Sequence, residues 1–236
     1  MFQSAGTSGE IRTKNYWYGC QSEYLHQHSH TQQTRQPTTY IKFFQLKLQH
    51  SIVATDNLVK LIAEQGTDIR LLQEPYTIQN KIVGIPKWHK NFTHGKSRTR
   101  AAIVVINNQI DTLLIKYFSD SDTVVLEVTL DNARIVLACM YLDINQHIDD
   151  NLLKIEAIIQ FSKGEGIILA IDSNSRSTTW HDKQTNARGR ILEEFLTSNQ
   201  LHILKEDSDY TTFSSTRGSR NIDLTIVNTQ LLRTVK

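Results

Sequence analysis

The stretch Gly166–His181, GIILAIDSNSRSTTWH, changes character abruptly at Asp172. The six residues before Asp172 are apolar or small, which is typical of a short strand covered on both faces. A carboxylate at the tip of such a strand is costly to bury unless a cation or hydrogen-bond donors accompany it. The stretch therefore predicts a buried strand that delivers polar side chains to a site for a charged ligand.

Predicted strands and helices extend on both sides of this stretch. Apolar periodicity predicts strands at 40–49, 68–74, 101–106, 111–118, 123–130, 134–142, 166–172, 201–205, 210–213 and 221–228, and helices at 54–66, 148–161 and 187–199. Asp56 is expected to cap the first helix and Gly66 to end it. Because strands follow one another both directly and through helices, we expect an α/β fold of mixed sheets packed together with helices outside.

The first 39 residues differ from the rest of the 236-residue chain. They are rich in Gln, Ser, Thr and His and lack apolar periodicity, so residues 1–39 are predicted to be a disordered tail and 40–236 a single domain. His26, His28 and His30 could bind a metal loosely, although alternating histidines in a polar tract are more often solvated.

Overall composition excludes some classes of protein. A net charge of +2 is too small to establish a nucleic-acid partner, so such a partner must be argued from local clusters. Cys20 and Cys139 lie far apart and lack zinc-site spacing, which favours a reducing compartment. The longest apolar run, residues 135–142, is too short to cross a bilayer, and no signal peptide is evident. We expect a soluble intracellular protein with no membrane partner.

Polar residues gather where predicted strands begin or end: Glu74, Tyr141, Asp172, Asn174 and Asp223. Each acid adjoins an apolar run, so we expect a cation or hydrogen-bonding partner for it. Oxygen ligands without a Cys/His cluster suit Mg²⁺ or Mn²⁺ better than zinc. The alternative, that each acid caps a loop, remains open on spacing alone.

Five segments occur in the order seen in one family: LLQEPY at 71–76, MYLD at 140–143, IDSNSRSTTWH at 171–181, ARG at 187–189 and TRGSRNIDLT at 216–225. From about residue 40 to its end, the chain resembles the apurinic-endonuclease-like domain of insect-type non-LTR (LINE-like) retrotransposons. That domain is a branch of the exonuclease III/DNase I, or endonuclease/exonuclease/phosphatase, superfamily. The resemblance implies a four-layered α/β sandwich of two mixed β-sheets flanked by helices.

The resemblance also implies roles for the polar residues. Glu74, with Asp172, is expected at a site for Mg²⁺ or Mn²⁺, and Asp172 to orient or deprotonate the attacking water. Asn174 is expected to hold the phosphate or the charge of the transition state, and the hydroxyl of Tyr141 to contact the phosphate. Asp223 corresponds to an aspartate that orients a catalytic histidine.

The motifs and their neighbours contain further candidates. Ser177, Lys47 and Thr225 are predicted to support the site. Trp180 lies in the segment that distinguishes the retrotransposon branch, and it is interpreted either as core or as a platform for DNA.

Residues 87–100, KWHKNFTHGKSRTR, contain five Lys or Arg residues, two histidines and no acid. Basic groups interleaved with aromatic residues can neutralise phosphates and pack against sugars or bases, although a solvated loop is the commoner reading of such a segment. The predicted DNA contacts are Lys96, Arg98, Arg100, Arg176, Trp180 and Arg217. Arg188, which opens a predicted helix, could instead be structural.

Two features depart from the family pattern. The family ends in a Ser-Asp-His motif on a further strand, whereas no histidine follows His202 here, so we expect a copy that lacks its final strand and cleaves weakly or not at all. Lys47 and Lys205 stand where asparagine is common. The ammonium of Lys47 would compete with Mg²⁺ or pair with Glu74 or Asp172.

The leading hypothesis is therefore a metal-dependent, nuclear endonuclease that nicks DNA and leaves a 3′-hydroxyl for a downstream reverse transcriptase. Two alternatives remain: a catalytically inactive nucleic-acid-binding remnant, and a small-molecule phosphatase of the same superfamily.

Overall fold

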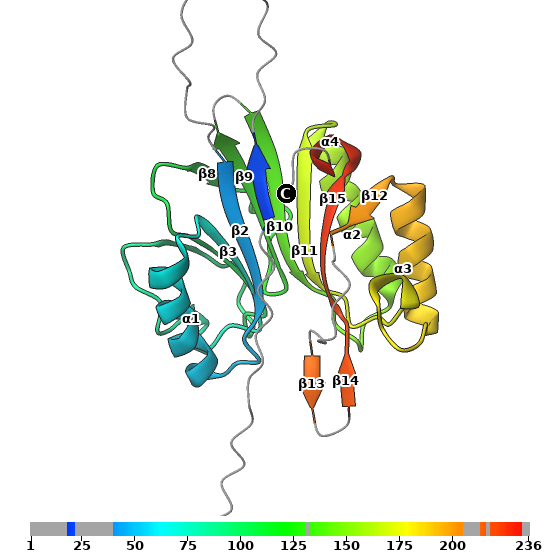
Figure 1. The fold of residues 1–236 in the computed structure, drawn as a ribbon, viewed down its shortest axis with the longest axis horizontal. Helices are drawn as coiled ribbons and strands as arrows, with labels where there is room; N and C mark the ends of the chain where they lie inside the picture. Colours follow the sequence, from blue (N-terminus) through cyan, green and yellow to red (C-terminus); the bar gives the residue numbers. More distant parts are fainter. Residues whose placement is uncertain (1–17, 22–39, 131–132, 205–212, 216–217, 233–236) are drawn as a thin grey trace, which may run out of the picture.

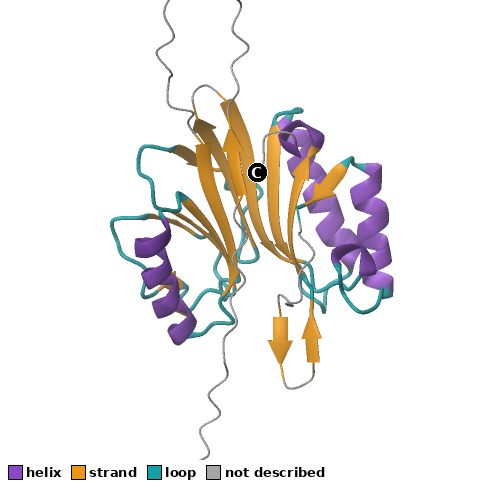
Figure 2. Cartoon of the chain, viewed as in Figure 1, coloured by secondary structure: helices purple, strands orange, loops and turns teal. Residues whose placement is uncertain are grey.

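The computed structural model describes residues 18–21, 40–130, 133–204, 213–215 and 218–232, and these form four layers. Two β-sheets pack face to face in the middle, helix α1 covers the outer face of one, and helices α2 and α3 cover the outer face of the other (Figures 1 and 2). The predicted α/β sandwich of two mixed sheets flanked by helices is confirmed.

The first sheet has five strands in the order β1-β2-β3-β7-β6. Their bounds are Tyr18–Gln21 (β1), Tyr40–Lys47 (β2), Ile69–Gln73 (β3), Ala101–Val105 (β7) and Lys90–Phe92 (β6), and α1 spans Ile52–Gln65. A small hairpin of β4 (Thr77–Ile78) and β5 (Lys81–Ile82) follows β3.

The second sheet has six strands in the order β12-β15-β11-β10-β9-β8. Their bounds are Leu201–Ile203 (β12), Asp223–Asn228 (β15), Gly166–Asp172 (β11), Ala133–Tyr141 (β10), Thr123–Leu130 (β9) and Asp111–Leu114 (β8). The helices here are α2 (Ile148–Ser162), η1 (Thr178–Trp180), α3 (Ala187–Ser198) and α4 (Thr229–Leu232), and a hairpin joins β13 (Phe213–Ser215) to β14 (Gly218–Arg220).

The apolar core divides into three clusters that match the layers. One lies between the two sheets, the second beneath α2 and α3, and the third beneath α1. Every residue of β11 is buried. The apolar run before Asp172 is therefore explained by a strand covered on both faces, as predicted.

Local capping sets the helix ends. Helix α1 begins at Ile52 because the Ser51 hydroxyl accepts a hydrogen bond from the amide of Ala54. The predicted cap, Asp56, lies exposed inside the helix, so that prediction was wrong. Gly66 ends the helix in the left-handed conformation, as predicted.

Strand direction brings five polar residues to one end of the molecule. β2 is parallel to β3, and β10 is parallel to β11, so these four strands carry Lys47, Glu74, Tyr141 and Asp172 at or just beyond their final residues. β15 runs antiparallel to β11 and begins at Asp223, which pairs with Asp172 in the ladder.

Several predictions fall wholly or partly outside the described residues. Within residues 1–39, the structure describes only β1, which pairs antiparallel with β2. The histidines at 26, 28 and 30, Lys205 and Arg217 all lie outside the described part. In the part of the chain that the structure describes, no helix is both long and apolar enough to span a membrane.

Candidate active site

Polar side chains cross the core between the two sheets just beneath the site. Gln73 donates from Nε2 to the carbonyl of Ala170 (3.0 Å), which ties β3 to β11. Gln45 donates to the carbonyl of Ile171 (3.3 Å) and accepts from the hydroxyl of Thr225 (2.7 Å). Because buried amides must be hydrogen-bonded, these contacts fix the spacing of the sheets below Asp172. The sequence prediction gave Thr225 a supporting role, but it missed both glutamines.

The centre of the site is an ion-paired cluster of Lys47, Glu74 and Asp172. The ammonium of Lys47 donates a hydrogen bond to Oδ2 of Asp172, and it lies 3.6 Å from Oε2 of Glu74. The Lys47 side chain is 7% exposed, that of Asp172 0% and that of Glu74 18%. One lysine therefore joins the two sheets at the point where their strands end. The sequence had left open whether Lys47 pairs with Glu74 or with Asp172, and in the structure it does both.

Electrostatics keep Lys47 charged. Burial alone would lower the pKa of Lys47, but the charges of Asp172, Asp223 and Glu74 outweigh burial and raise that pKa above its ordinary value. Complete burial raises the pKa of Asp172, and the charge of Lys47 works against that rise. Oδ1 of Asp172 has no hydrogen-bond partner among the described residues, which leaves it able to accept one.

Tyr141 and Asn174 lie beside this cluster. Burial, followed by the charges of Glu74 and Asp172, raises the pKa of Tyr141, so its hydroxyl stays protonated and can donate. Asn174 follows β11 with a positive φ of 46° and donates from Nδ2 to the carbonyl of Leu142 (3.1 Å). Glu74 also has a positive φ, 49°, and its backbone is held by the carbonyl of Arg100 and the amide of His50. Such strained positions are common where a backbone aims a functional side chain.

Asp223 is the third carboxylate near Lys47. It is 8% exposed and lies directly across the ladder from Asp172, and its charge helps to raise the pKa of Lys47. The structure thus brings all five strand-end residues of the sequence prediction to one place.

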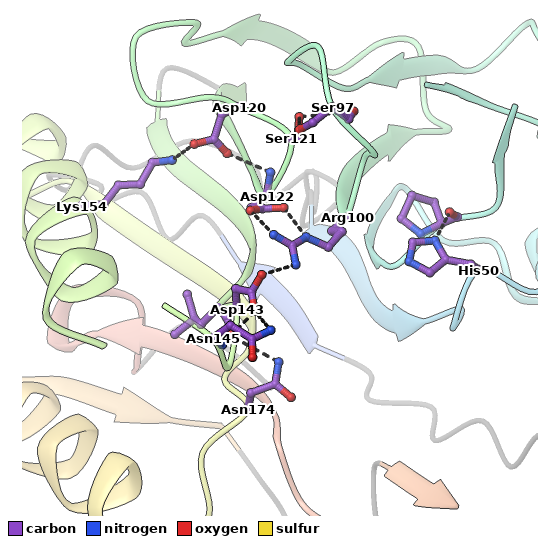
Figure 3. Close-up of polar contacts among 12 residues, drawn as sticks. His50, Ser97, Arg100, Asp120, Ser121, Asp122, Asp143, Asn145, Lys154 and Asn174 are labelled. Atoms are coloured by element: carbon purple, nitrogen blue, oxygen red, sulfur yellow. Dashed lines mark hydrogen bonds and ion pairs between the residues drawn. The ribbon is translucent and has the colours of Figure 1, made fainter. Parts of the chain in front are cut away.

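A second cluster, Arg100–Asp122–Asp143, forms the rim of the site (Figure 3). Arg100 donates from Nε (2.6 Å) and Nη2 (2.6 Å) to the two carboxylate oxygens of Asp122, and from Nη1 to Asp143 (2.5 Å). Its guanidinium also lies 4.5 Å from the ring centroid of Tyr141. Arg100 was predicted to contact DNA. Because two carboxylates already engage all three of its nitrogens, we assign it to holding Tyr141 and the loop after β10.

The end of the basic loop is docked beside this rim. The hydroxyls of Ser97 and Ser121 lie 2.6 Å apart (Figure 3), and a Cβ at Gly95 would lie 2.6 Å from the backbone nitrogen of Ser121. Lys96 and Arg98 are exposed on the docked loop, and Trp88 is 73% exposed earlier in the same segment. Lys96 and Arg98 remain candidates for DNA contact, whereas Trp88 lies toward the other end of the first sheet, where Asn108 donates to its carbonyl.

Other predicted contacts have structural roles. Trp180 is fully buried in the core beneath α2 and α3, so the prediction that it contacts DNA was wrong and its core alternative holds. Arg176 pairs with Asp182, with its Nε 2.9 Å from Oδ1. Ser177 donates to the carboxylate of Glu193 and accepts from the amide of Thr179, so it supports the loop after β11.

The ARG segment also shapes the site indirectly. Arg188 donates to the carbonyls of Gln146 (2.9 Å), Asp143 (3.2 Å) and Ser173 (3.4 Å), so it ties together the loops after β10 and β11. A Cβ at Gly189 would collide with the carbonyl of Arg176. These contacts agree with the alternative prediction, in which Arg188 has a structural role.

Comparisons with known proteins agree with this architecture. Residues 135–236 match a family model described as endonuclease-reverse transcriptase. The chain is 25% identical over 199 residues to the putative 115 kDa protein in the type-1 retrotransposable element R1DM of Drosophila melanogaster. It is 26% identical over 136 residues to the Pol polyprotein of the type-1 element R1 of Bradysia coprophila. These matches cover 81% and 54% of this chain but only 19% and 14% of the two relatives, so the chain spans a fifth or less of their length.

Solved structures show the same fold. The endonuclease domain of TRAS1, a telomere-specific non-LTR retrotransposon, superposes with a TM-score of 0.72 at 26% identity, covering 82% of this chain and 87% of that one. The AP endonuclease LMAP of Leishmania major superposes with a TM-score of 0.65 at 12% identity, covering 81% and 80%, which supports the fold alone. The chain thus has the fold of the endonuclease/exonuclease/phosphatase superfamily, and both its sequence and its structure are similar to endonuclease domains of non-LTR retrotransposons.

Proposed function

We propose that this domain nicks DNA by hydrolysing one phosphodiester bond, and that it leaves a 3′-hydroxyl from which reverse transcription can start. One observation carries the proposal: Asp172, Asn174 and Tyr141 lie together at the ends of neighbouring strands, beside Glu74 from the other sheet. A protonated hydroxyl, a neutral amide and a carboxylate are the groups that hydrolysis of a phosphodiester needs in one place.

Each group has a distinct task in the proposed reaction. The hydroxyl of Tyr141 and the amide of Asn174 donate to the non-bridging oxygens of the phosphate. Oδ1 of Asp172 accepts a proton from the attacking water while Lys47 holds Oδ2. The water oxygen bonds to phosphorus as the bond from phosphorus to the 3′ oxygen breaks. The departing 3′ oxygen takes a proton from solvent water to become a hydroxyl, and the proton on Asp172 returns to solvent.

DNA is the proposed substrate and partner because the exposed groups on the loop docked beside the site are cationic. Lys96 and Arg98 carry positive charge on the docked loop and can neutralise backbone phosphates. We propose that the domain works with a reverse transcriptase and acts in the nucleus, where its DNA target lies.

The resemblance implies Mg²⁺ or Mn²⁺ at Glu74 and Asp172, but these residues do not fit such an ion as they are arranged. Oδ2 of Asp172 is engaged by Lys47, whose ammonium also pairs with Glu74. Among the described residues, no group of three His, Cys, Asp or Glu side chains converges as a metal site would require. We therefore propose that cleavage is slow, because the base is fully buried and already paired.

The test is nicking of supercoiled plasmid by the domain in Mg²⁺, in Mn²⁺ and in EDTA. We expect slow conversion to open circles, and we expect Asp172→Asn to reduce it to background, a loss of at least about a hundredfold, because the variant lacks the proton acceptor. Asp56→Asn, an exposed acid of α1, is the matched control and should nick like the wild type. Equal rates for Asp172→Asn and the wild type would contradict the proposed site.

A second candidate, a nucleic-acid-binding domain without cleavage, is favoured by the burial of Asp172. It predicts DNA binding that weakens with salt, no nicking under any condition and products indistinguishable from input plasmid. Under either function, replacing both Lys96 and Arg98 with alanine should lower the salt slope of DNA affinity by about two. Lys60→Ala, an exposed lysine on α1, should leave the slope unchanged.

A further inference from the structure

The ammonium of Lys47 is the cation that the structure itself provides at the centre of the site. It comes from the last residue of β2, and it reaches Asp172, 125 residues away on the other sheet. Only 7% of the Lys47 side chain is exposed, and its ammonium lies 5.8 Å from the ring centroid of Tyr141. Lys47 thus hydrogen-bonds one side chain assigned to the reaction, Asp172, and lies close to a second, Tyr141.

The position of this ammonium decides what else can bind. A divalent ion held by Glu74 and Asp172 would have to share their oxygens, and Lys47 already hydrogen-bonds one of these residues and ion-pairs with the other. Two cations a few ångströms apart in a buried, low-dielectric site repel each other strongly. Metal binding at this place therefore requires the ammonium to leave.

We propose that Lys47 is a built-in replacement for the divalent cation of this site, so that the chain assembles the site without metal and binds Mg²⁺ or Mn²⁺ there only weakly. The inference concerns the site used by the proposed function, but it predicts cation binding and not cleavage. It can therefore fail while the proposed function stands, and it can hold in a chain that does not nick.

The test is titration of the domain with Mn²⁺, with free Mn²⁺ followed by electron paramagnetic resonance. We expect the wild type and Glu74→Gln to bind Mn²⁺ equally. The Lys47 ammonium already occupies the site, so Glu74 does not contribute to Mn²⁺ affinity in the wild type. Lys47→Gln, which has similar length, no charge and an oxygen ligand, should bind Mn²⁺ at least about tenfold more tightly than the wild type. Lys47→Arg keeps a cation and should show no gain.

Lys42→Gln is the matched control, since Lys42 lies toward the other end of the same strand. It should bind Mn²⁺ like the wild type. Wild-type binding that Glu74→Gln weakens tenfold would overturn the proposal, as would a folded Lys47→Gln variant with unchanged affinity.

Loss of the buried cation could prevent Lys47→Gln from folding, and near-ultraviolet circular dichroism with and without Mn²⁺ checks this. Folding that returns only with Mn²⁺ supports the proposal, because the metal then replaces the ammonium. If the variant stays unfolded under both conditions, the comparison of wild type with Glu74→Gln decides: equal Mn²⁺ affinity supports the proposal and unequal affinity overturns it.

Discussion

Two charged clusters lie side by side in this molecule, and they are built differently. The central cluster, Lys47–Glu74–Asp172, comes from strand ends, and its closest pair, Lys47 and Asp172, is almost completely buried, with Glu74 18% exposed. The rim cluster, Arg100–Asp122–Asp143, comes from strand ends and loops, and its side chains are 16–23% exposed. The central cluster leaves one oxygen of Asp172 without a partner, whereas in the rim cluster the fork of Arg100 engages both aspartates.

This difference assigns the reaction to the central cluster and a supporting role to the rim cluster. A guanidinium fixes the geometry of carboxylates through several directed hydrogen bonds, which suits Arg100 to holding the loop after β10. An ammonium is a compact point charge that can be replaced by another cation, which suits Lys47 to a place where charge matters more than direction. Because Oδ1 of Asp172 has no hydrogen-bond partner in the described part of the chain, the central cluster is the one with an acceptor available for the reaction.

The largest expected effect is on stability and comes from the central cluster. Lys47→Met should lower the free energy of unfolding by about 3–5 kcal/mol, because it leaves the buried Asp172 without its ion-pair partner. Urea denaturation at neutral pH measures this. Adding Asp172→Asn should restore part of the loss, and a cost below about 1 kcal/mol for Lys47→Met would show that the pair is not buried as described.

The rim cluster should contribute less. Arg100→Ala is expected to cost about 1–2 kcal/mol, because partial exposure screens its pairs with Asp122 and Asp143. The same denaturation experiment applies. Arg98→Ala, an exposed neighbour, should stay within about 0.5 kcal/mol of the wild type, and an equal loss in both variants would mean that the rim pairs contribute nothing specific.

Acid should remove part of the rim contribution. The Asn145 amide and then Arg100 lower the pKa of Asp143, so its folded-state pKa lies below its unfolded value. Its stabilisation is therefore complete above the unfolded pKa, about 4, and is lost as the pH falls through the folded pKa. Asp143→Asn should be less stable than the wild type at pH 7, and the two should converge toward pH 2. A constant difference over this range would contradict the ionic role of Asp143.

Salt should give the smallest difference between the clusters. The coupling between Arg100 and Asp122, measured by a double-mutant cycle, should fall by a few tenths of a kcal/mol between 0.1 and 1 M NaCl, because ions screen exposed pairs. The coupling between Lys47 and Asp172 should change less, since dissolved ions screen a buried pair only weakly. Equal salt sensitivity would place both clusters at the surface.

Sequence patterns predicted the helices and strands whose own apolar residues reveal which face is buried. β11, α2 and α3 follow their apolar periodicity to within a residue or so. The short strands β1 and β6 were missed because they exist through pairing with β2 and β7, and their own residues carry little pattern. Ser51 was missed as the cap of α1 because a carboxylate nearby, Asp56, looked equally suitable.

The site was predictable where strand ends meet, since parallel strands must deliver their last residues to the same edge. What the sequence could not give were the partners of charged groups. Arg100 and Arg176 resemble DNA contacts in composition, but the carboxylates that engage them are brought near by folding. Trp180 looked equally suited to core and surface, because its burial depends on α2 and α3 packing over it.

The most direct test of the account is a crystal structure of the domain grown with Mn²⁺, with anomalous diffraction measured at the manganese edge. We predict that the ammonium of Lys47 lies between the carboxylates of Glu74 and Asp172 and that no anomalous peak appears there. A manganese peak coordinated by Glu74, with the Lys47 side chain displaced, would contradict the account, as would carboxylates too far apart to share one cation.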